Sequence, residues 1–296
     1  MAKISVVINT LNEEKGLPHV IASVKEFADE IVVCDMESTD STVKVAKGLG
    51  AKVFSHPRIH YVEPARNFAV AKATGEWILI LDVDETIPKT LQKHLLSIIK
   101  TSKNDYFRLP RKNLIFGKWI KHSRWWPDYN IRFFKKGHVS WNEVIHAVPM
   151  TQGRGADIPA KEALAIIHDN YPTIEIYFER MNRYTGVQSK LLIEGGYKFD
   201  WRDLIKKPLS EFLGRYFKGE GYKDGIHGLA LAGLQAFSEL ALYLKVWQEG
   251  KFGEESPDLS EIKKEFQSAE KEVNWWLIHT TEKGIVGKVK KKLLKR

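Results

Sequence analysis

Apolar and polar positions alternate in blocks over the first ninety residues of the chain. Apolar runs at 4–8, 30–34, 52–54 and 77–81 are short and rich in branched side chains, which predicts buried strands. Segments at 18–28, 42–49 and 65–73 have helical spacing and lie between these runs. The alternation of strand and helix predicts an α/β fold with a mostly parallel sheet, right-handed crossovers and helices on both faces.

The pattern changes twice after this first stretch. Residues 106–167 contain short strands and turns rich in Arg and Trp, whereas residues 174–296 have mainly helical spacing. We therefore predict a first domain at 1–170, with halves at 1–100 and 101–170, and a mainly helical, basic region at 171–296.

Polar side chains directly follow three of the predicted strands. The first strand is followed by Thr10, Asn12 and Glu13, the second by Asp35, and the fourth by Asp82 and Asp84. Ligands of such sheets bind beyond the carboxyl ends of the strands, so these groups are expected at one edge. In an extended chain Asp82 and Asp84 share a face, and both can bind one Mg²⁺ or Mn²⁺ together with phosphate oxygens. The structural alternative is a pair of solvated acids ahead of a helix at 89–99.

Four motifs, taken together and in this order, resemble family-2 glycosyltransferases. They are the strand and Asn-Glu of 4–13, the Asp-x-x-Ser-x-Asp-x-Thr block of 35–42, Ala65-Arg66-Asn67, and Gly75-Glu76 followed by Asp82-Val83-Asp84. The resemblance covers about ninety residues. It implies the GT-A fold, Rossmann-like, with a nucleotide-sugar-binding half at 1–100 and an acceptor-side half at 101–170. It also implies inversion at the anomeric carbon, a UDP-sugar donor and a divalent metal.

The resemblance further implies a role for each matching position. Thr10, Asn12 and Glu13 would contact the uridine or its ribose, and Asp35 would bind the base. Arg66 would face the donor phosphates or brace the acids, Asp82 would lie toward the ribose, and Asp84 would hold the metal. Many members carry two adjacent acids at the end of the second strand, whereas this chain has Asp35-Met36.

A later stretch resembles the lipopolysaccharide-core β-glucosyltransferase branch. It comprises Trp125-Trp126-Pro127-Asp128-Tyr129 and Arg132-Phe133-Phe134. A carboxylate beside tryptophans suits an acceptor pocket, so we predict Asp128 as the general base, with Glu143 as the alternative. The structural alternative is a turn aspartate beside core tryptophans. GT-A enzymes often add a late histidine to the metal shell; His146 or His168 could serve, and we select His146.

Charge and cysteine content bear on where the protein acts. The chain carries 46 Lys and Arg against 37 acids, and Lys283–Arg296 contains seven basic residues and no acid. The one cysteine, Cys34, allows no internal disulfide, and no signal peptide is recognised, so we predict a cytoplasmic protein. The apolar segment 225–247 with its basic flanks predicts peripheral contact with the inner face of the cell membrane. The alternative is a core helix or the contact of a homodimer.

These observations predict an inverting, metal-dependent glycosyltransferase. It would move a hexose such as glucose from a UDP-sugar to a glycan or glycolipid acceptor, in lipopolysaccharide-core or other cell-envelope glycan synthesis. One alternative is transfer to a polyprenyl phosphate or a protein side chain. An alternative of another class is a basic protein that binds nucleic acid or membranes without catalysis. We expect no nucleic acid partner, because Lys and Arg form no single stripe interleaved with aromatic residues.

Overall fold

A computed structural model describes residues 3–58, 63–141 and 149–281 of the chain. Contacts divide the chain into two compact units. The first contains Met1–Leu114 and Trp126–Asn170, and the second contains Ile115–Trp125 and Tyr171–Arg296. Segment 115–125, which we expected in the first domain, therefore belongs with the helices that follow residue 170.

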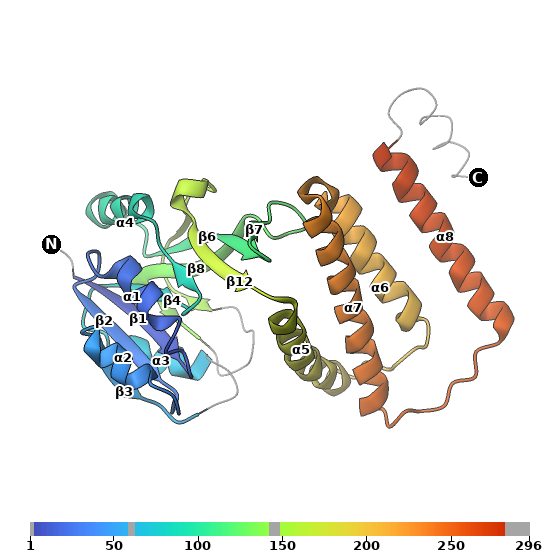
Figure 1. The fold of residues 1–296 in the computed structure, drawn as a ribbon, viewed down its shortest axis with the longest axis horizontal. Coiled ribbons are helices and arrows are strands. Elements are labelled where there is room, and N and C mark those ends of the chain that lie inside the picture. The colour runs from blue at the N-terminus through green and yellow to red at the C-terminus, as the bar shows by residue number, and fades with distance from the viewer. Residues whose placement is uncertain (1–2, 59–62, 142–148, 282–296) are drawn as a thin grey trace. The chain divides into compact units, whose positions relative to one another are not determined.

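The first unit is built on a mixed β-sheet (Figure 1), with strands in the order β3-β2-β1-β4-β8-β6-β12-β5. The four strands predicted in the first ninety residues are present and parallel to one another: β1 (Ile4–Thr10), β2 (Glu30–Asp35), β3 (Lys52–Ser55) and β4 (Trp77–Leu81). Beyond β4, strand β8 (Asp128–Lys135) pairs antiparallel with β4, and β6 (Tyr106–Ile115) pairs antiparallel with β8. The first half of the sheet is thus parallel, whereas the second half is mixed, since β11 (Gly155–Asp157) pairs parallel with β6.

Shorter elements complete the described part of the chain. They are β5 (Glu85–Thr86), β7 (Lys118–Trp119), β9 (Val139–Ser140), β10 (Met150–Thr151), β11 (Gly155–Asp157), β12 (Ile166–Tyr171), η1 (Glu162–Leu164), η2 (Gly214–Lys218) and η3 (Gly221–Asp224).

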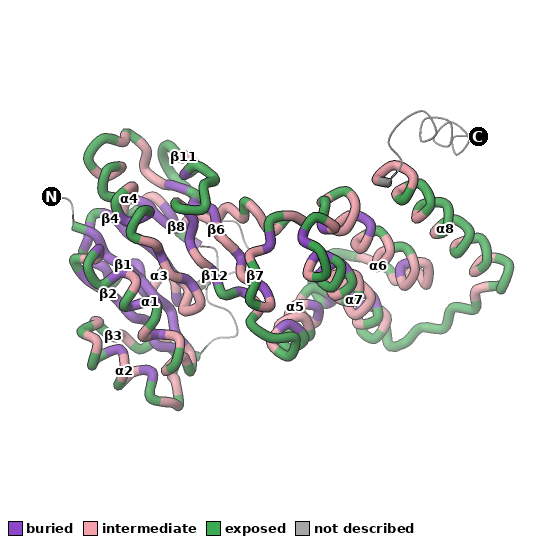
Figure 2. Tube along the Cα trace, turned by 45° about the horizontal axis from the view of Figure 1, so that its top comes forward, coloured by how far each residue is buried: buried purple, intermediate pink, exposed green. Residues whose placement is uncertain are grey.

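Alternate side chains of the buried strands build two apolar cores, one on each face of the sheet. Figure 2 shows β1 and β4 buried along their length. One face of β1 packs with helices α1 (Leu17–Val24), α2 (Thr42–Gly48) and α4 (Lys89–Thr101). The opposite face, which includes Val7 and Ile80, packs against α3 (Glu63–Lys72). Side chains alternate between the faces of a strand, so a strand apolar on both faces must be covered on both, as the sequence predicts.

The turn that leads into β4 is fixed by close contact with β1. A Cβ atom on Gly75 would lie 2.7 Å from the backbone nitrogen of Ser5 and 2.8 Å from the carbonyl oxygen of Lys3, so no other residue fits there. Ser5 Oγ accepts a hydrogen bond from the backbone of Gly75 at 2.8 Å and donates one to Glu30 Oε1 at 2.5 Å. Burial alone would raise the pKa of Glu30, but hydrogen bonds from Lys52, Ser5 and the turn lower that pKa to about 2.

The second unit is helical, as predicted. It contains α5 (Ile174–Glu194), α6 (Asp203–Leu213), α7 (Ile226–Glu249) and α8 (Leu259–Thr281), and α7 packs against both α5 and α6. Segment 115–125 contributes Ile115 and Ile120, which pack on Leu231 of α7. Arg202, at the start of α6, forms ion pairs with Glu261 and Glu265 of α8.

Helix α7 combines buried and exposed apolar positions. Its exposed positions recur at helical spacing and include Ile226, Leu229, Phe237 and Leu244. By length and composition alone α7 could cross a membrane, and 28% of its most apolar window is buried. The same test is passed by core helices of soluble proteins, so the expected position of α7 at a membrane surface stays a prediction.

Candidate active site

The carboxyl ends of β1 and β2 place Thr10 and Asp35 side by side. The two residues are partners in the parallel register, and Thr10 Oγ1 donates a hydrogen bond to Asp35 Oδ1 at 3.3 Å. Asp35 Oδ2 accepts a hydrogen bond from the backbone of Ser38 at 3.0 Å, and the residue is 4% exposed. Strand pairing therefore places Asp35 at the predicted edge of the sheet. Each carboxylate oxygen accepts one of these hydrogen bonds and can accept another.

The loops after β1 and β2 are tied together by side chains of the predicted motifs. Asn12, which has a φ of 57°, accepts a hydrogen bond from the backbone of Thr39 at 2.7 Å. The backbone of Asn12 donates to Ser38 Oγ at 2.8 Å, and that of Glu13 donates to Thr42 Oγ1 at 2.7 Å. Asparagine tolerates the left-handed region better than most residues, so Asn12 suits this turn. The described structure thus gives Asn12 a bracing role in this edge of the sheet.

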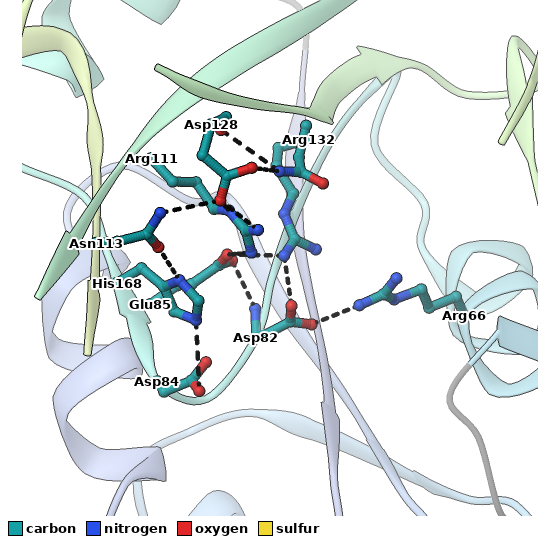
Figure 3. Close-up of polar contacts among 10 residues, drawn as sticks. Arg66, Asp82, Asp84, Glu85, Arg111, Asn113, Asp128, Arg132 and His168 are labelled. Carbon is teal, nitrogen blue, oxygen red and sulfur yellow. Dashed lines mark hydrogen bonds and ion pairs between the residues drawn. The ribbon is translucent and has the colours of Figure 1, made fainter. Parts of the chain in front are cut away.

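Directly after β4, Asp82 lies between two arginines (Figure 3). Arg66 donates to Asp82 Oδ1 at 2.7 Å, and Arg132 contacts Asp82 Oδ2. Burial opposes the charge of this carboxylate, but Arg132 and Arg66 outweigh burial and hold the pKa of Asp82 well below its ordinary value. Of the two roles predicted for Arg66, the structure shows the bracing of an acid. The predicted contact of Asp82 with the ribose stays a prediction.

A third acid, Glu85, completes the cluster and was not singled out from the sequence. Its side chain is fully buried, and Oε1 accepts from Arg132 at 2.7 Å and from Arg111 at 3.2 Å. Its other oxygen, Oε2, accepts from the backbone of Asp82 at 3.0 Å. Glu85 therefore fixes the turn that carries the Asp-x-Asp motif. The sequence signal that could have identified Glu85 is its position as a third acid directly after Asp82-Val83-Asp84.

Asp84, in the same turn, faces a histidine from a distant strand. His168 Nε2 lies 3.6 Å from Asp84 Oδ2, and His168 Nδ1 lies 2.6 Å from Asn113 Oδ1. His168 comes from β12, which pairs antiparallel with β5, so that His168 stands opposite Glu85 in the register. The sequence offered His168 only as the second of two late histidines. The selected one, His146, lies outside the described residues, as does Glu143.

The predicted general base, Asp128, is held at the start of β8. Its Oδ2 accepts from Arg111 Nη2 at 2.6 Å and Nε at 2.9 Å, and from Asn113 Nδ2 at 3.1 Å. Its Oδ1 accepts from Asn130 Nδ2 at 3.2 Å. Arg111 and Asn113 are alternate residues of β6 and share one face of that strand. Their alternation was visible in the sequence, but nothing there linked it to Asp128.

The side chains at Asp84 fit a divalent cation of the kind predicted. No group of three or more His, Cys, Asp or Glu that could hold a metal occurs among residues 3–58, 63–141 and 149–281. Mg²⁺ and similar ions are commonly held by one or two side chains, with substrate phosphates and water supplying the other ligands. One carboxylate in the turn after β4 and one imidazole on β12 meet that requirement only when a phosphate ligand is also present.

Comparison with known proteins shows the family of the chain. The sequence profile described as glycosyl transferase family 2 matches residues 5–153. An uncharacterized glycosyltransferase of Rickettsia typhi is 31% identical over 255 residues, which cover 83% of this chain and 87% of the relative. The lipopolysaccharide core biosynthesis glycosyltransferase LpsC of Rhizobium meliloti is 23% identical, over 83% of this chain and 92% of that protein.

Solved structures of similar proteins were also found. Glucosyl-3-phosphoglycerate synthase of Mycobacterium tuberculosis, in complex with Mn²⁺ and uridine-diphosphate-glucose, is 19% identical with a TM-score of 0.43. The match covers 67% of this chain and 80% of that one. The profile match over half of the chain and the similarity to the Rickettsia relative over 83% of the chain confirm the resemblance read from the motifs, and the predicted fold class with it. The chain belongs to glycosyltransferase family 2 and has the GT-A fold.

Proposed function

We propose that this chain is an inverting glycosyltransferase that moves a sugar from a UDP-sugar to an acceptor hydroxyl. The observation that carries the proposal is the meeting of Asp84 and His168 just beyond β4. Asp35 ends β2, and β2 and β4 both pair in parallel with β1, so these groups lie along one edge of the sheet. That edge is where an α/β sheet binds its ligand.

Each side chain would do a different part of the work. Asp35 would accept a hydrogen bond from an N–H group of the uracil base, since its carboxylate retains acceptor capacity. Asp84 and His168 would hold Mg²⁺ or Mn²⁺, which offsets the negative charge that develops on the diphosphate leaving group. The Asp82, Glu85 and Arg132 cluster would keep the turn that presents Asp84 rigid. Much of the rate gain would come from holding the two substrates in reacting geometry.

The general base is proposed from the two predicted acids. Asp128 Oδ2 already accepts three hydrogens, so Asp128 could take a proton from the acceptor only through Oδ1. We propose Asp128 acting through Oδ1 as the base, with Glu143 as the alternative. Comparing kcat of Asp128→Asn and Glu143→Gln at saturating donor and saturating Mn²⁺ tests the choice. A general base contributes roughly 10²–10⁴-fold, so the variant with the loss in this range identifies it.

The acceptor is proposed to be a sugar hydroxyl of a cell-envelope glycan, with a hexose such as glucose as the transferred group. Similarity to LpsC over nearly its whole length supports an acceptor of the lipopolysaccharide-core type. Labelled donor offered to core oligosaccharide, to polyprenyl phosphate and to peptides would separate this acceptor from the alternatives. Label in the peptide or the polyprenyl fraction alone would refute it.

The donor and the metal are tested together by binding and turnover. We expect UDP-sugars to raise the thermal midpoint in the presence of Mn²⁺ and to do so less after chelation. Asp84→Ala should lower kcat by at least about a hundredfold while the fold survives, because several kcal/mol of charge stabilisation are lost. The matched control is Asp169→Ala, an exposed acid whose backbone bonds to Asp84 but whose side chain lies on the opposite face of β12 from His168. Near-normal turnover by Asp84→Ala, with chelation also harmless, would refute the metal role.

We further propose that the enzyme works in the cytoplasm, on the anionic inner face of the membrane. The exposed apolar positions of α7 supply the insertion surface, and the seven basic residues of Lys283–Arg296 supply charge complementary to anionic lipid. The full chain should sediment with vesicles containing anionic lipid, less so with purely zwitterionic vesicles, and the double variant Phe237→Ser with Leu244→Ser should bind less. Met150→Ser is the control, since Met150 is an exposed apolar residue of the other unit. Equal binding by all variants, or a stable dimer with no vesicle binding, would refute this.

A further inference from the structure

A continuous line of side chains connects Asp128 to Asp84 through the interior of the first unit (Figure 3). Asp128 Oδ2 lies 3.1 Å from Asn113 Nδ2, Asn113 Oδ1 lies 2.6 Å from His168 Nδ1, and His168 Nε2 lies 3.6 Å from Asp84 Oδ2. The four residues come from β8, from β6, from β12 and from the turn after β4. Asn113 is fully buried and His168 is 6% exposed, so water does not compete freely for these contacts.

The charge at one end of this line fixes the direction of every hydrogen bond along it. Asp128 is paired with the guanidinium of Arg111, and a carboxylate so paired can only accept hydrogens. Asn113 must therefore turn its amide nitrogen toward Asp128 and its carbonyl oxygen toward His168. A carbonyl oxygen can only accept, so His168 must carry a hydrogen on Nδ1.

The consequence appears at the other ring nitrogen. A neutral imidazole with hydrogen on Nδ1 has a lone pair on Nε2, and in His168 that nitrogen faces the carboxylate of Asp84. Two hydrogen-bond acceptors that face each other at 3.6 Å make no hydrogen bond to each other. Their lone pairs can instead coordinate one cation together. The other tautomer would direct N–H at the place where the cation should bind.

We infer that Asn113 is a positioning residue that sets the tautomer of His168 and so makes Nε2 available to the divalent cation. The inference rests on the proposed function, because it requires the cation that Asp84 and His168 would share. It assigns Arg111 and Asp128 a part as well, since they orient the Asn113 amide. Groups that orient metal-binding histidines typically change metal affinity by about 10- to 100-fold when they are removed.

The test measures Mn²⁺ binding to the full chain directly, by electron paramagnetic resonance of free Mn²⁺, with and without UDP. Asn113→Leu removes the oxygen that accepts from His168 at nearly constant size, and Mn²⁺ affinity should fall by about 10- to 100-fold. The matched control is Asn130→Leu. Asn130 also bonds to Asp128, at 3.2 Å, but to Oδ1 rather than to Oδ2, the oxygen that Asn113 contacts, so the Mn²⁺ affinity should stay within about twofold.

A double-variant comparison and a spectroscopic measurement complete the test. If Asn113 acts through His168, adding Asn113→Leu to His168→Ala should weaken Mn²⁺ binding no further. In the unaltered protein without metal, at a pH where the imidazole is neutral, the nitrogen-15 signals of His168, assigned by their loss in His168→Gln, should show hydrogen on Nδ1 and none on Nε2. This second readout stands even if Asn113→Leu does not fold.

The possible failures are distinguishable. If the unaltered protein binds Mn²⁺ but Asn113→Leu binds it equally well, or if the nitrogen-15 signals place the hydrogen on Nε2, the role of Asn113 is refuted and the proposed function stands. If the unaltered protein binds UDP-sugars but no Mn²⁺ under any condition, the metal role in the proposed function is refuted and this inference with it.

Discussion

Replacement of Arg132 by methionine should strongly destabilise the first unit. Arg132 is 4% exposed, and its guanidinium contacts both Asp82 and the fully buried Glu85. Removing one partner of a buried ion pair typically costs about 3–5 kcal/mol, because the remaining charge is left without compensation. Arg66 still neutralises Asp82 and Arg111 still contacts Glu85, so we expect a loss near the lower end, about 3 kcal/mol. Domains are stable by only about 5–15 kcal/mol, so this loss is readily measured.

Urea unfolding followed by circular dichroism measures the effect, and Arg108→Met is the matched control. Arg108 also forms a two-point ion pair, with Asp157 at 2.6 and 2.7 Å, but these side chains are 51% and 40% exposed. An exposed pair contributes about 0–1 kcal/mol, so the control should change little. The comparison isolates burial, because the chemical change is the same in both variants.

The pH dependence gives the result that would refute the reasoning. Burial opposes the charge of Asp82, but Arg132 and Arg66 outweigh burial and lower its pKa. The ionised carboxylate therefore adds to the free energy of unfolding above its ordinary pKa, and this contribution is lost as the pH falls through the lowered pKa. The difference in the free energy of unfolding between Arg132→Met and the unaltered protein should be largest near pH 7. It should shrink below about pH 4, as the carboxylate of Asp82 protonates. A cost no greater than that of Arg108→Met would show that this charge network does not stabilise the fold. A difference that stays constant down to about pH 2 would show that the cost does not arise from the charge of Asp82.

Three further predictions concern the sheet. Glu30→Gln should lower the free energy of unfolding by roughly 2 kcal/mol near pH 7, and this difference should disappear as the pH falls from 4.5 to about 2, because the fold lowers the pKa of Glu30. Unfolding at several pH values measures the difference, and a difference that does not change with pH would contradict the prediction. Burial, together with the nearby charge of Asp35, raises the pKa of the fully buried Cys34 thiol to about 11. A thiol reagent should therefore label Cys34 only when the protein unfolds, and rapid labelling of the folded protein would contradict this. Gly75→Ala should destabilise by at least about 2 kcal/mol, since its Cβ meets backbone atoms of β1, whereas Gly48→Ala, where the Cβ meets nothing within 4 Å, serves as the control; equal unfolding midpoints would contradict the close contact.

The first half of the sheet could be predicted because its information is local. Apolar runs such as 4–8 and 77–81 must be buried on both faces, and the acids that follow them must then lie at the carboxyl ends of neighbouring strands. The antiparallel part was not predicted in detail, because short strands after residue 100 pair through contacts between residues far apart in the chain. The transfer of segment 115–125 to the helical unit has the same origin: its apolar residues are buried by α7, more than a hundred residues later.

The sequence by itself determined the family, the parallel strands and the edge where Asp35, Asp82 and Asp84 lie, since periodicity and motif order need no long-range contact. Only the tertiary structure decided which groups surround those acids. His168 reaches Asp84 because β12 pairs with β5, and Asn113 and Asp128 reach His168 because β6 lies between β8 and β12 in the sheet. Pairings between strands separated by fifty or more residues depend on the packing of the whole unit, and no local pattern in the sequence records them.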